Sequence, residues 1–369
     1  MAGTGVGAPT GRALTPSSAP AAPVIATTAG TPGSTIARVT FGRMQEAAGA
    51  AEATCGSVRR HFSIGGSPLE LCFAGPALLP LARALEHLSS APADGAALRV
   101  QLWDTASSGV PAVPLPRDVP AVEGNDGLAI RSIVQQQPLS MSLFSPQPPE
   151  AVYWIRDAGT LTLREHSSPL REILHWWQWQ RGRQLVHAGA VAVGEDGVLI
   201  AGVSGSGKST STLACLLEGL DYVGDDHVLL ADEGEPTIYS VYNTAKLHPD
   251  HARTFPRLWP HIANPEALDV GKARWFVQDL APERLRRRIR AKAVVVPRVG
   301  SGWTTRFQAI SPGAALLALA PSTIIQLRGV DDRAFAWMAR FVARLPCYRL
   351  ELGREPASIA DAVRELIAR

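Results

Sequence analysis

The chain has 369 residues, of which 46% are hydrophobic and 19% are charged, and its formal net charge is +3. This length predicts about two folded domains, and the composition excludes a low-complexity or fibrous chain. The four cysteines are widely separated and lack the C-x-x-C spacing of a zinc or redox site, so we expect free thiols.

Residues 1–36 predict a disordered tail. They contain no acidic residue and are dominated by Ala, Pro, Thr, Gly and Ser, a composition that buries too little apolar surface to offset the entropy of ordering. The segment lacks the continuous apolar core of a secretion signal, and no later stretch has the roughly 18 apolar residues that span a membrane. The sequence therefore favours a cytoplasmic protein without a membrane partner.

Residues 37–150 predict a small α/β domain. Residues 68–74 alternate like a half-buried strand, residues 77–89 have helical spacing, and residues 97–103 have the pattern of another strand. Proline-rich sequence follows, and we place the domain boundary at residue 150. The second domain is then residues 151–369.

The second domain is expected to begin with a hairpin and a helix. Residues 152–155 and 160–163 flank Asp157-Ala-Gly, which is typical of a hairpin turn. Apolar residues recur with helical spacing from Leu170 onward, which places Trp177 in the core. Trp176 and Trp179 would then cover an interface between the domains.

The stretch GVSGSGKS fits the spacing G-x-x-x-x-G-K-[ST] of a phosphate-binding loop. In such a loop, glycines turn backbone N–H groups toward phosphate oxygens, Lys208 supplies a cation and Ser209 holds Mg²⁺. A predicted strand, residues 197–203, precedes the loop and a predicted helix, residues 210–220, follows it, so phosphates would bind at a helix N-terminus. We expect ATP and Mg²⁺ as cofactors, with the nucleotide held by Gly202, Ser204, Gly205, Ser206, Gly207, Lys208, Ser209 and Thr210.

Two carboxylates follow the helix. The apolar residues 220–223 complete a β-α-β unit, whose right-handed crossover places the ends of both strands at one edge of the sheet. Asp225 and Asp226 therefore emerge beside the phosphate loop. In a phosphotransferase, one carboxylate there would hold Mg²⁺ and another would accept the proton of the acceptor hydroxyl.

His187 begins the apolar strand that leads into the strand before the loop. If Glu195 and Asp196 form a two-residue turn, the pairing places His187 opposite Ser204. An imidazole close to bound phosphates indicates a functional role.

Basic residues greatly outnumber acidic ones between residues 251 and 308, and they include a run of closely spaced arginines. Such a run is typical of a surface that binds phosphate or an acidic peptide, although a solvated helix face remains an alternative. It lacks the interleaved aromatic residues of a stacking platform, so no nucleic-acid partner is expected. The candidate acceptor-binding residues are Arg286, Arg287, Arg288 and Arg290.

The loop, the aspartate pair and the histidine resemble the catalytic domain of the HPr kinase/phosphorylase family, bacterial enzymes that phosphorylate a serine hydroxyl. The resemblance covers about residues 180–250. It implies an α/β fold in which a P-loop, HPr-kinase-like catalytic domain follows the small α/β domain. It also implies that Asp225 is the catalytic base, that Asp226 assists it or binds Mg²⁺ with Ser209, and that His187 lies close to both.

The wider frame resembles HPr-kinase-like proteins of peptide natural-product clusters, including kinases that modify lasso-peptide precursors. This likeness rests on the segments HWW, residues 175–177, and LPCYRLELG, residues 345–353. Thr210 stands where the family usually has Glu, and no counterpart of its Glu-Arg-Gly-Leu-Gly segment follows the aspartates. The resemblance therefore implies a peptide, a protein other than HPr or a small hydroxylated molecule as the acceptor.

Two other classes of function stay open, a P-loop ATPase and a non-catalytic nucleotide-binding regulator. Residues 228–233 resemble an apolar strand that ends in Asp-Glu, but the following Gly-Glu-Pro predicts a hairpin turn there. A GTPase is disfavoured because the sequence has no N-K-x-D motif, which residues 243–246 resemble only superficially. The sequence leaves the oligomeric state open, a homo-oligomer included.

Overall fold

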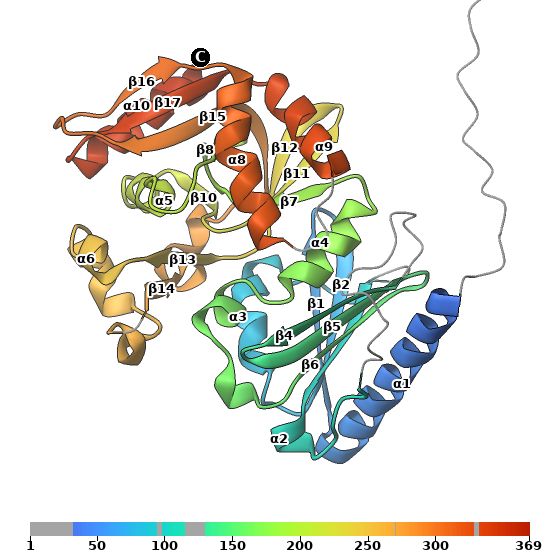
Figure 1. Cartoon of the computed structure of the whole chain (residues 1–369). Helices are drawn as coiled ribbons and strands as arrows, with labels where there is room; N and C mark the ends of the chain where they lie inside the picture. Colours follow the sequence, from blue (N-terminus) through green and yellow to red (C-terminus); the bar gives the residue numbers. More distant parts are fainter. Residues whose placement is uncertain (1–31, 94–97, 115–129, 270, 328–331) are drawn as a thin grey trace, which may run out of the picture.

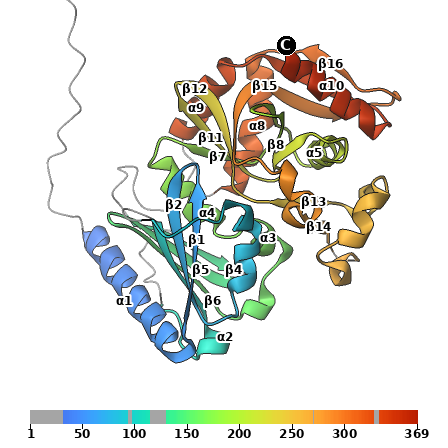
Figure 2. The same cartoon turned by 180° about the vertical axis from the view of Figure 1, so that it is seen from behind.

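A computed structural model describes residues 32–93, 98–114, 130–269, 271–327 and 332–369. In this part of the chain, two large β-sheets of six and nine strands carry helices on their faces, which gives a mixed α/β fold (Figure 1). A third, two-stranded sheet lies beside the larger one and is also visible from behind (Figure 2). No helix in the described ranges is long and apolar enough to cross a membrane.

The first sheet has the strand order β1-β2-β3-β6-β5-β4. Helix α1 (Pro32–Cys55) packs on one face, and the 3-10 helix η1 (Leu79–Leu88) together with α4 (Arg171–Trp179) packs on the other. The strands are β1 (Ser57–Ile64), β2 (Ser67–Ala74), β3 (Leu98–Asp104), β4 (Arg131–Gln136), β5 (Leu139–Pro146) and β6 (Pro149–Ile155). Short helices are α2 (Thr105–Ser108), η2 (Ala158–Thr160) and α3 (Leu163–Ser167).

The N-terminal boundary differs from the prediction. Helix α1 begins at Pro32, so residues 32–36 are helical, while residues 1–31 of the predicted tail lie outside the described residues. The reason is tertiary packing, because Phe41, Met44 and Ala48 lie on one side of the helix and are buried against the sheet.

The predicted boundary at residue 150 also needs correction. It falls inside β6, which pairs with β3 and β5 as far as Ile155. The prolines that indicated a linker instead form the tight turn between β5 and β6, where Pro146 pairs with Pro149.

The predicted hairpin, in which residues 152–155 and 160–163 flank Asp157, does not form. Asp157 accepts a hydrogen bond from the backbone N–H of Gly159 at 2.8 Å, and the chain turns into η2 and then α3. A capping box between Thr162 and Glu165 starts α3 and prevents a returning strand. Trp177 is buried in the core, which confirms that prediction, and Trp176 is buried in the same cluster, which includes residues from both large sheets.

The second sheet has the order β10-β8-β9-β15-β12-β11-β7, with β17 paired to β15 and to the edge strand β16. Helices α5 (Lys208–Leu217) and α10 (Pro356–Ala368) pack on one face, and α8 (Pro312–Gln326) and α9 (Asp332–Ala343) on the other. The strands are β7 (Gln184–Val186), β8 (Gly189–Val193), β9 (Asp196–Ile200), β10 (Asp221–Gly224), β11 (Val228–Glu233), β12 (Glu235–Ser240), β15 (Arg288–Val299), β16 (Arg306–Ala309) and β17 (Cys347–Leu352).

The two-stranded sheet joins β13 (Thr244–Leu247) to β14 (Ala273–Phe276) in antiparallel pairing. Short helices surround it and connect it to β15. They are α6 (Pro249–Ala252), η3 (Pro256–His261), η4 (Pro265–Ala267), α7 (Val277–Leu280) and η5 (Pro282–Arg284).

The order of strands brings the predicted phosphate loop and the aspartate pair to one edge of the sheet. Strand β8 lies between β9 and β10 and is antiparallel to both, so β9 and β10 run in the same direction. The segments that follow these two strands therefore leave the sheet at the same edge, as the β-α-β prediction required, although the two strands are not direct neighbours.

His87 at the end of η1 joins the two large sheets. Its Nε2 lies 2.7 Å from Ser240 Oγ on β12, and burial, with the nearby charge of Arg287, lowers its pKa to about 3. The unfolded chain takes up a proton near the ordinary pKa of about 6.5, whereas the folded chain does so only near pH 3. Stability contributed by neutral His87 is therefore present above pH 6.5 and is lost progressively as the pH falls toward 3.

We expect His87→Asn, which keeps a polar partner for Ser240 but cannot titrate, to flatten the pH dependence of stability. Between pH 6 and pH 4, its free energy of unfolding should fall less steeply than that of the wild type, by about 1.4 kcal/mol per pH unit. Urea unfolding at several pH values measures this difference. Parallel slopes for the two proteins would show that His87 does not resist protonation.

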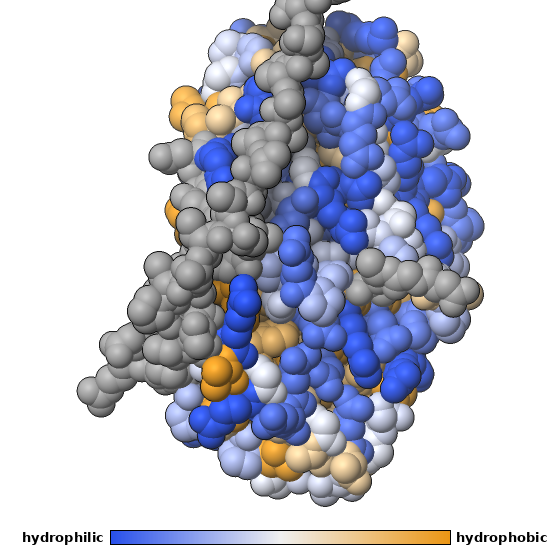
Figure 3. Space-filling view, turned by 90° about the vertical axis from the view of Figure 1, so that its right-hand side faces the viewer, coloured by the Kyte–Doolittle hydropathy of each residue, from blue (hydrophilic) through white to orange (hydrophobic). Residues whose placement is uncertain are grey.

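One face of the molecule is shown in space-filling form in Figure 3. Hydrophilic side chains dominate its coloured area, and the hydrophobic ones that are visible form small separate groups. This distribution is typical of a surface in contact with water.

Candidate active site

The predicted phosphate loop connects β9 to α5. Gly205 and Gly207 have φ angles of +81° and +103°, and a Cβ at Gly207 would come within 2.3 Å of Leu352 Cδ1, so glycine is required there. Lys208 begins α5, and its ammonium donates to the carbonyl oxygens of Gly202 (2.7 Å) and Val203 (3.2 Å). Burial lowers the pKa of Lys208, and the charges of the two aspartates oppose this shift.

Asp225 lies behind the start of α5 and is only 2% exposed. Its Oδ1 accepts a hydrogen bond from the Thr212 hydroxyl at 3.1 Å, and its Oδ2 accepts one from the backbone N–H of Lys246 at 3.1 Å. Burial raises the pKa of Asp225, while the Lys246 N–H works in the opposite direction. The Ser209 side chain also hydrogen-bonds this carboxylate, so its hydrogen-bond partners are uncharged donors.

Asp226 faces the other way, toward a cation. Its Oδ2 accepts from Lys246 Nζ at 2.8 Å and from the Ser168 hydroxyl at 3.0 Å, and its Oδ1 lies 3.4 Å from His187 Nε2. Burial alone would raise the pKa of Asp226, but the Lys246 charge and the neighbouring histidines outweigh burial and hold the pKa well below its ordinary value. This carboxylate therefore stays ionised.

His187 lies close to Asp226, as the resemblance implied, but the predicted strand pairing that would place it opposite Ser204 is wrong. The turn residues are Gly194 and Glu195, because Val193 pairs with Asp196, and β8 begins only at Gly189. His187 therefore lies outside the strand pairing instead of opposite Ser204. Its backbone N–H donates to the Thr323 hydroxyl at 3.1 Å, which anchors the residue to α8.

A second histidine, His227, adjoins this group. Its ring centroid lies 5.5 Å from that of His187, and burial lowers its pKa to about 4, so it is neutral at pH 7. Its Nδ1 lies 3.2 Å from Asp226 Oδ2, a polar contact without hydrogen-bond geometry. No motif or spacing in the sequence marks His227 as a site residue.

Lys246 was also missed as a site residue, because its segment was considered only as a superficial match to a GTPase motif. It contacts Asp225 through its backbone and Asp226 through its side chain. The signal that could have found it is the scarcity of lysine, since the chain has only four, at positions 208, 246, 272 and 292.

A pocket of about 450 Å³ opens above the loop, within the range of about 300–1,000 Å³ that is usual for small-molecule sites. The predicted residues Gly202, Ser206 and Lys208 are not among those that line it, although Lys208 and Gly202 shape the loop through their hydrogen bond. Cationic side chains and two histidines surround it, and among the described residues no Asp or Glu lines it. The lining residues are Ser204, Gly205, Gly207, Ser209, Thr210, Lys246, Leu247, His248, His251, Thr254, Lys272, Val299, Gly300, Leu352, Gly353, Arg354 and Ile359.

The arginine run predicted to bind the acceptor lies elsewhere. Strand β15 is parallel to β9, and Arg290 pairs with Asp196 at the start of both strands, at the edge opposite the loop. Arg290 contacts Asp196 through two hydrogen bonds of 2.8 and 3.1 Å, and Arg286 lies 3.0 Å from Asp221. Arg287 donates to backbone oxygens of His87 and Ser89, and Arg288 lies 3.5 Å from Glu235. These side chains join parts of the fold and are not in the candidate site.

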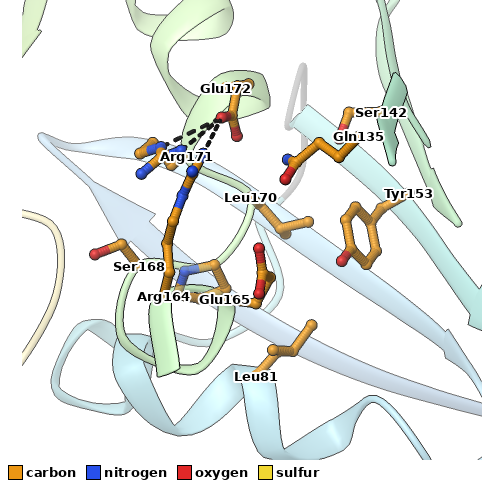
Figure 4. A pocket seen from close by; sticks show the side chains of 11 residues that line it. Leu81, Gln135, Ser142, Tyr153, Arg164, Glu165, Ser168, Leu170, Arg171 and Glu172 are labelled. Carbon is orange, nitrogen blue, oxygen red and sulfur yellow. Dashed lines mark hydrogen bonds and ion pairs between the residues drawn. The ribbon is translucent and has the colours of Figure 1, made fainter. Parts of the chain in front are cut away.

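A second hollow lies between the first sheet and the residues that lead into α4 (Figure 4). Its volume is about 20 Å³, which is room for about one water molecule. Arg171 and Arg164 both approach the Glu172 carboxylate there, at 2.8 and 3.3 Å. The hollow is too small for a nucleotide. The pocket above the loop is large enough and is lined by residues of the loop itself, so it is the candidate site.

A comparison with solved structures finds the Hpr(Ser) kinase/phosphatase from Coxiella burnetii. The sequence identity is 14%, the TM-score is 0.29, and the alignment covers 49% of this chain and 95% of that chain. No protein-family model and no curated protein matches. At such identity and TM-score, the likeness does not indicate a function, which has to be inferred from the residues of the site.

The donor groups of the site suit Mg²⁺. Within the described ranges, no group of three or more His, Cys, Asp and Glu side chains could hold a metal by itself. The Ser209 hydroxyl and the Asp226 carboxylate offer hard oxygen ligands, and Mg²⁺ is commonly bound by one or two such groups together with water and phosphate oxygens. The types of donor therefore suit a metal that arrives with a nucleotide, although the Ser209 side chain itself hydrogen-bonds Asp225.

Proposed function

We propose that this chain is an ATP-dependent kinase that transfers the γ-phosphate to a hydroxyl group, that of a serine in a peptide or protein acceptor. The observation that carries the proposal is the meeting of two segments at one sheet edge. The loop with Lys208 and Ser209 follows β9, and Asp225 and Asp226 follow the parallel strand β10. Cation, metal ligand and carboxylates are the parts that phosphoryl transfer requires.

In the proposed reaction, N–H groups of the loop and the Lys208 ammonium hold the phosphates of ATP. Ser209 and Asp226 hold Mg²⁺, which neutralises phosphate charge when bound. Asp226 suits this role because its surroundings are already arranged for a cation, at present the Lys246 ammonium at 2.8 Å. His187 supports the orientation of Asp226 from the side of Oδ1.

Asp225 is proposed as the general base. Its hydrogen bonds come from uncharged donors, Thr212 and the Lys246 N–H, so it remains a better proton acceptor than a carboxylate paired with a cation. The oxygen of the acceptor hydroxyl bonds to the γ-phosphorus while the bond from that phosphorus to ADP breaks. The proton of the hydroxyl passes to the Asp225 carboxylate.

We propose a ribosomally made peptide precursor as the acceptor, on the resemblance to kinases of peptide natural-product clusters. The first sheet and α1 form a proposed N-terminal unit that precedes the catalytic unit. The P-loop ATPase alternative needs a metal-binding carboxylate at Asp232, but this side chain pairs with Arg344 beside the hairpin turn at Gly234. A nucleotide-binding regulator stays as the second candidate, because the same loop would serve it.

Intact-mass analysis of peptides encoded beside the gene, incubated with the protein, ATP and Mg²⁺, tests the proposal. We expect one peptide to gain the mass of a phosphoryl group, and ADP release to depend on that peptide. Steady ADP release without any acceptor would favour an ATPase. Nucleotide binding without turnover, with every peptide unchanged, would favour the regulator.

A further inference from the structure

Lysine is concentrated at the candidate site. Of the 36 basic residues in the chain, 32 are arginine and only four are lysine. Lys208 lies in the phosphate loop, and Lys246 and Lys272 line the pocket above it. Lys292, on β15, is the fourth lysine and is not among the residues that line the pocket.

Lys246 and Lys272 are brought together by the small sheet. Strands β13 and β14 pair Leu247 with Ala273, and continuing that antiparallel register places Lys272 opposite His248. Because side chains alternate between the two faces of a strand, Lys246, His248 and Lys272 share one face. All three line the pocket, so this face forms part of its wall.

Lys272 carries a charge that no neighbouring side chain of the described residues neutralises. It is exposed, and no ion pair or hydrogen bond engages its ammonium within the described part of the chain. Its charge acts on Lys208 and helps to lower the pKa of that residue, after the larger effect of burial. The Lys272 ammonium at the pocket and the Lys208 ammonium in the loop therefore repel each other, and such a pair creates a favourable position for an anion between them.

At Asp226, the Lys246 ammonium occupies a position that another cation can take. The ammonium pairs with this carboxylate, which is proposed to hold Mg²⁺. Ammonium is a compact charge on a flexible stem, whereas the guanidinium of arginine binds carboxylates through a rigid fork, as Arg290 does with Asp196. Lysine is therefore the residue that can move from a carboxylate to a nearby phosphate oxygen.

We infer that Lys246 and Lys272 form, with Lys208, a three-ammonium cradle for the terminal phosphate groups of the nucleotide. The inference rests on the proposed function and adds two phosphate-binding residues from the small sheet. The cradle also explains why the pocket is lined by cations without any acidic residue among those described. Lys246 and Lys272 would stabilise the negative charge of the phosphoryl group from the small sheet, in addition to Lys208 from the loop.

Titration with inorganic tripolyphosphate in the absence of divalent metal tests Lys272. We expect Lys272→Met to weaken binding about tenfold, since an ion-assisted hydrogen bond is lost. Lys292→Met removes the same charge outside the pocket and should leave the affinity unchanged. Lys272→Arg should recover part of the loss. Equal affinities for Lys272→Met and Lys292→Met would overturn the assignment of Lys272.

Lys246 needs a different design, because its removal leaves Asp226 unpaired and repelling the ligand. Asp226→Asn removes that complication, so Asp226→Asn is compared with the double variant Asp226→Asn/Lys246→Met. We expect the double variant to bind tripolyphosphate about tenfold more weakly than Asp226→Asn alone. If the two bind equally, Lys246 only pairs with Asp226 and the cradle is wrong.

The same titration separates this inference from the proposed function. Binding of tripolyphosphate and MgATP by the wild type, with no effect of either lysine, would contradict the cradle alone. A wild-type protein that binds neither ligand would contradict both. Urea unfolding of every variant shows whether a lost affinity reflects a lost fold.

Discussion

Lys208→Ala is expected to lower the rate of phosphoryl transfer by a factor on the order of 10³ while the protein remains folded. The ammonium is the fixed cation of the loop, and its present partners are the carbonyl oxygens of Gly202 and Val203. When phosphates are bound, the same group can stabilise the charge that develops on the transferred phosphoryl. Single-turnover transfer to the identified acceptor, with stability measured in parallel, gives the result.

Lys292→Ala is the matched control, because it removes an exposed lysine on β15 that does not line the pocket. Its rate should equal that of the wild type. If folded Lys208→Ala transferred phosphate at the normal rate, the loop would not be a phosphate-binding loop. Loss of activity in both variants would instead indicate a general effect of reduced positive charge.

Asp225→Asn should lower the transfer rate by about 10² to 10⁴ with little change in affinity for MgATP. Asparagine keeps the shape of the side chain. Its oxygen can accept from the Lys246 N–H and its amide nitrogen can donate to the Thr212 hydroxyl, which itself donates to the carbonyl oxygen of Ser209, but asparagine cannot take up a proton at neutral pH. Isothermal titration of MgATP and single-turnover transfer measure binding and chemistry separately.

Asp226→Asn should behave differently, because it removes a ligand of the metal. We expect weaker Mg²⁺-dependent nucleotide binding and a rate that recovers in part at high Mg²⁺ concentration. Normal transfer by Asp225→Asn would remove Asp225 from the role of base, and Asp226 or His187, which adjoin each other at 3.4 Å, would be the next candidates. Identical defects in the two variants would mean that the carboxylates act as one unit.

The local elements of the site were predictable from short-range patterns. The apolar run before the loop forms β9, Lys208 begins α5 directly after the glycines, and the predicted hairpin turn between β11 and β12 falls at Gly234. These features depend on glycine spacing and on apolar runs, which act over a few neighbouring residues.

Other predictions failed where packing between distant segments decides the outcome. Prolines at residues 146–149 indicated a domain boundary but form a turn inside the first sheet. The arginine run indicated an anion site, yet its arginines form ion pairs with carboxylates of other strands. These carboxylates are Asp196, Asp221 and Glu235. The sequence alone does not show which carboxylate a given arginine will meet, because the partners are far apart along the chain.

The sequence by itself determined that the chain carries a G-x-x-x-x-G-K-[ST] loop between a strand and a helix, with an aspartate pair soon after it. Only the tertiary structure decided what surrounds them. It separates the surroundings of the two carboxylates, because the Asp225 side chain contacts Thr212 while the Asp226 side chain contacts Lys246 and His187. It also brings Lys246 and Lys272 to one pocket, since their proximity arises from pairing of β13 with β14 across a long connection. Local spacing encodes a loop, whereas the electrostatic surroundings of that loop depend on contacts that form only when the sheets assemble.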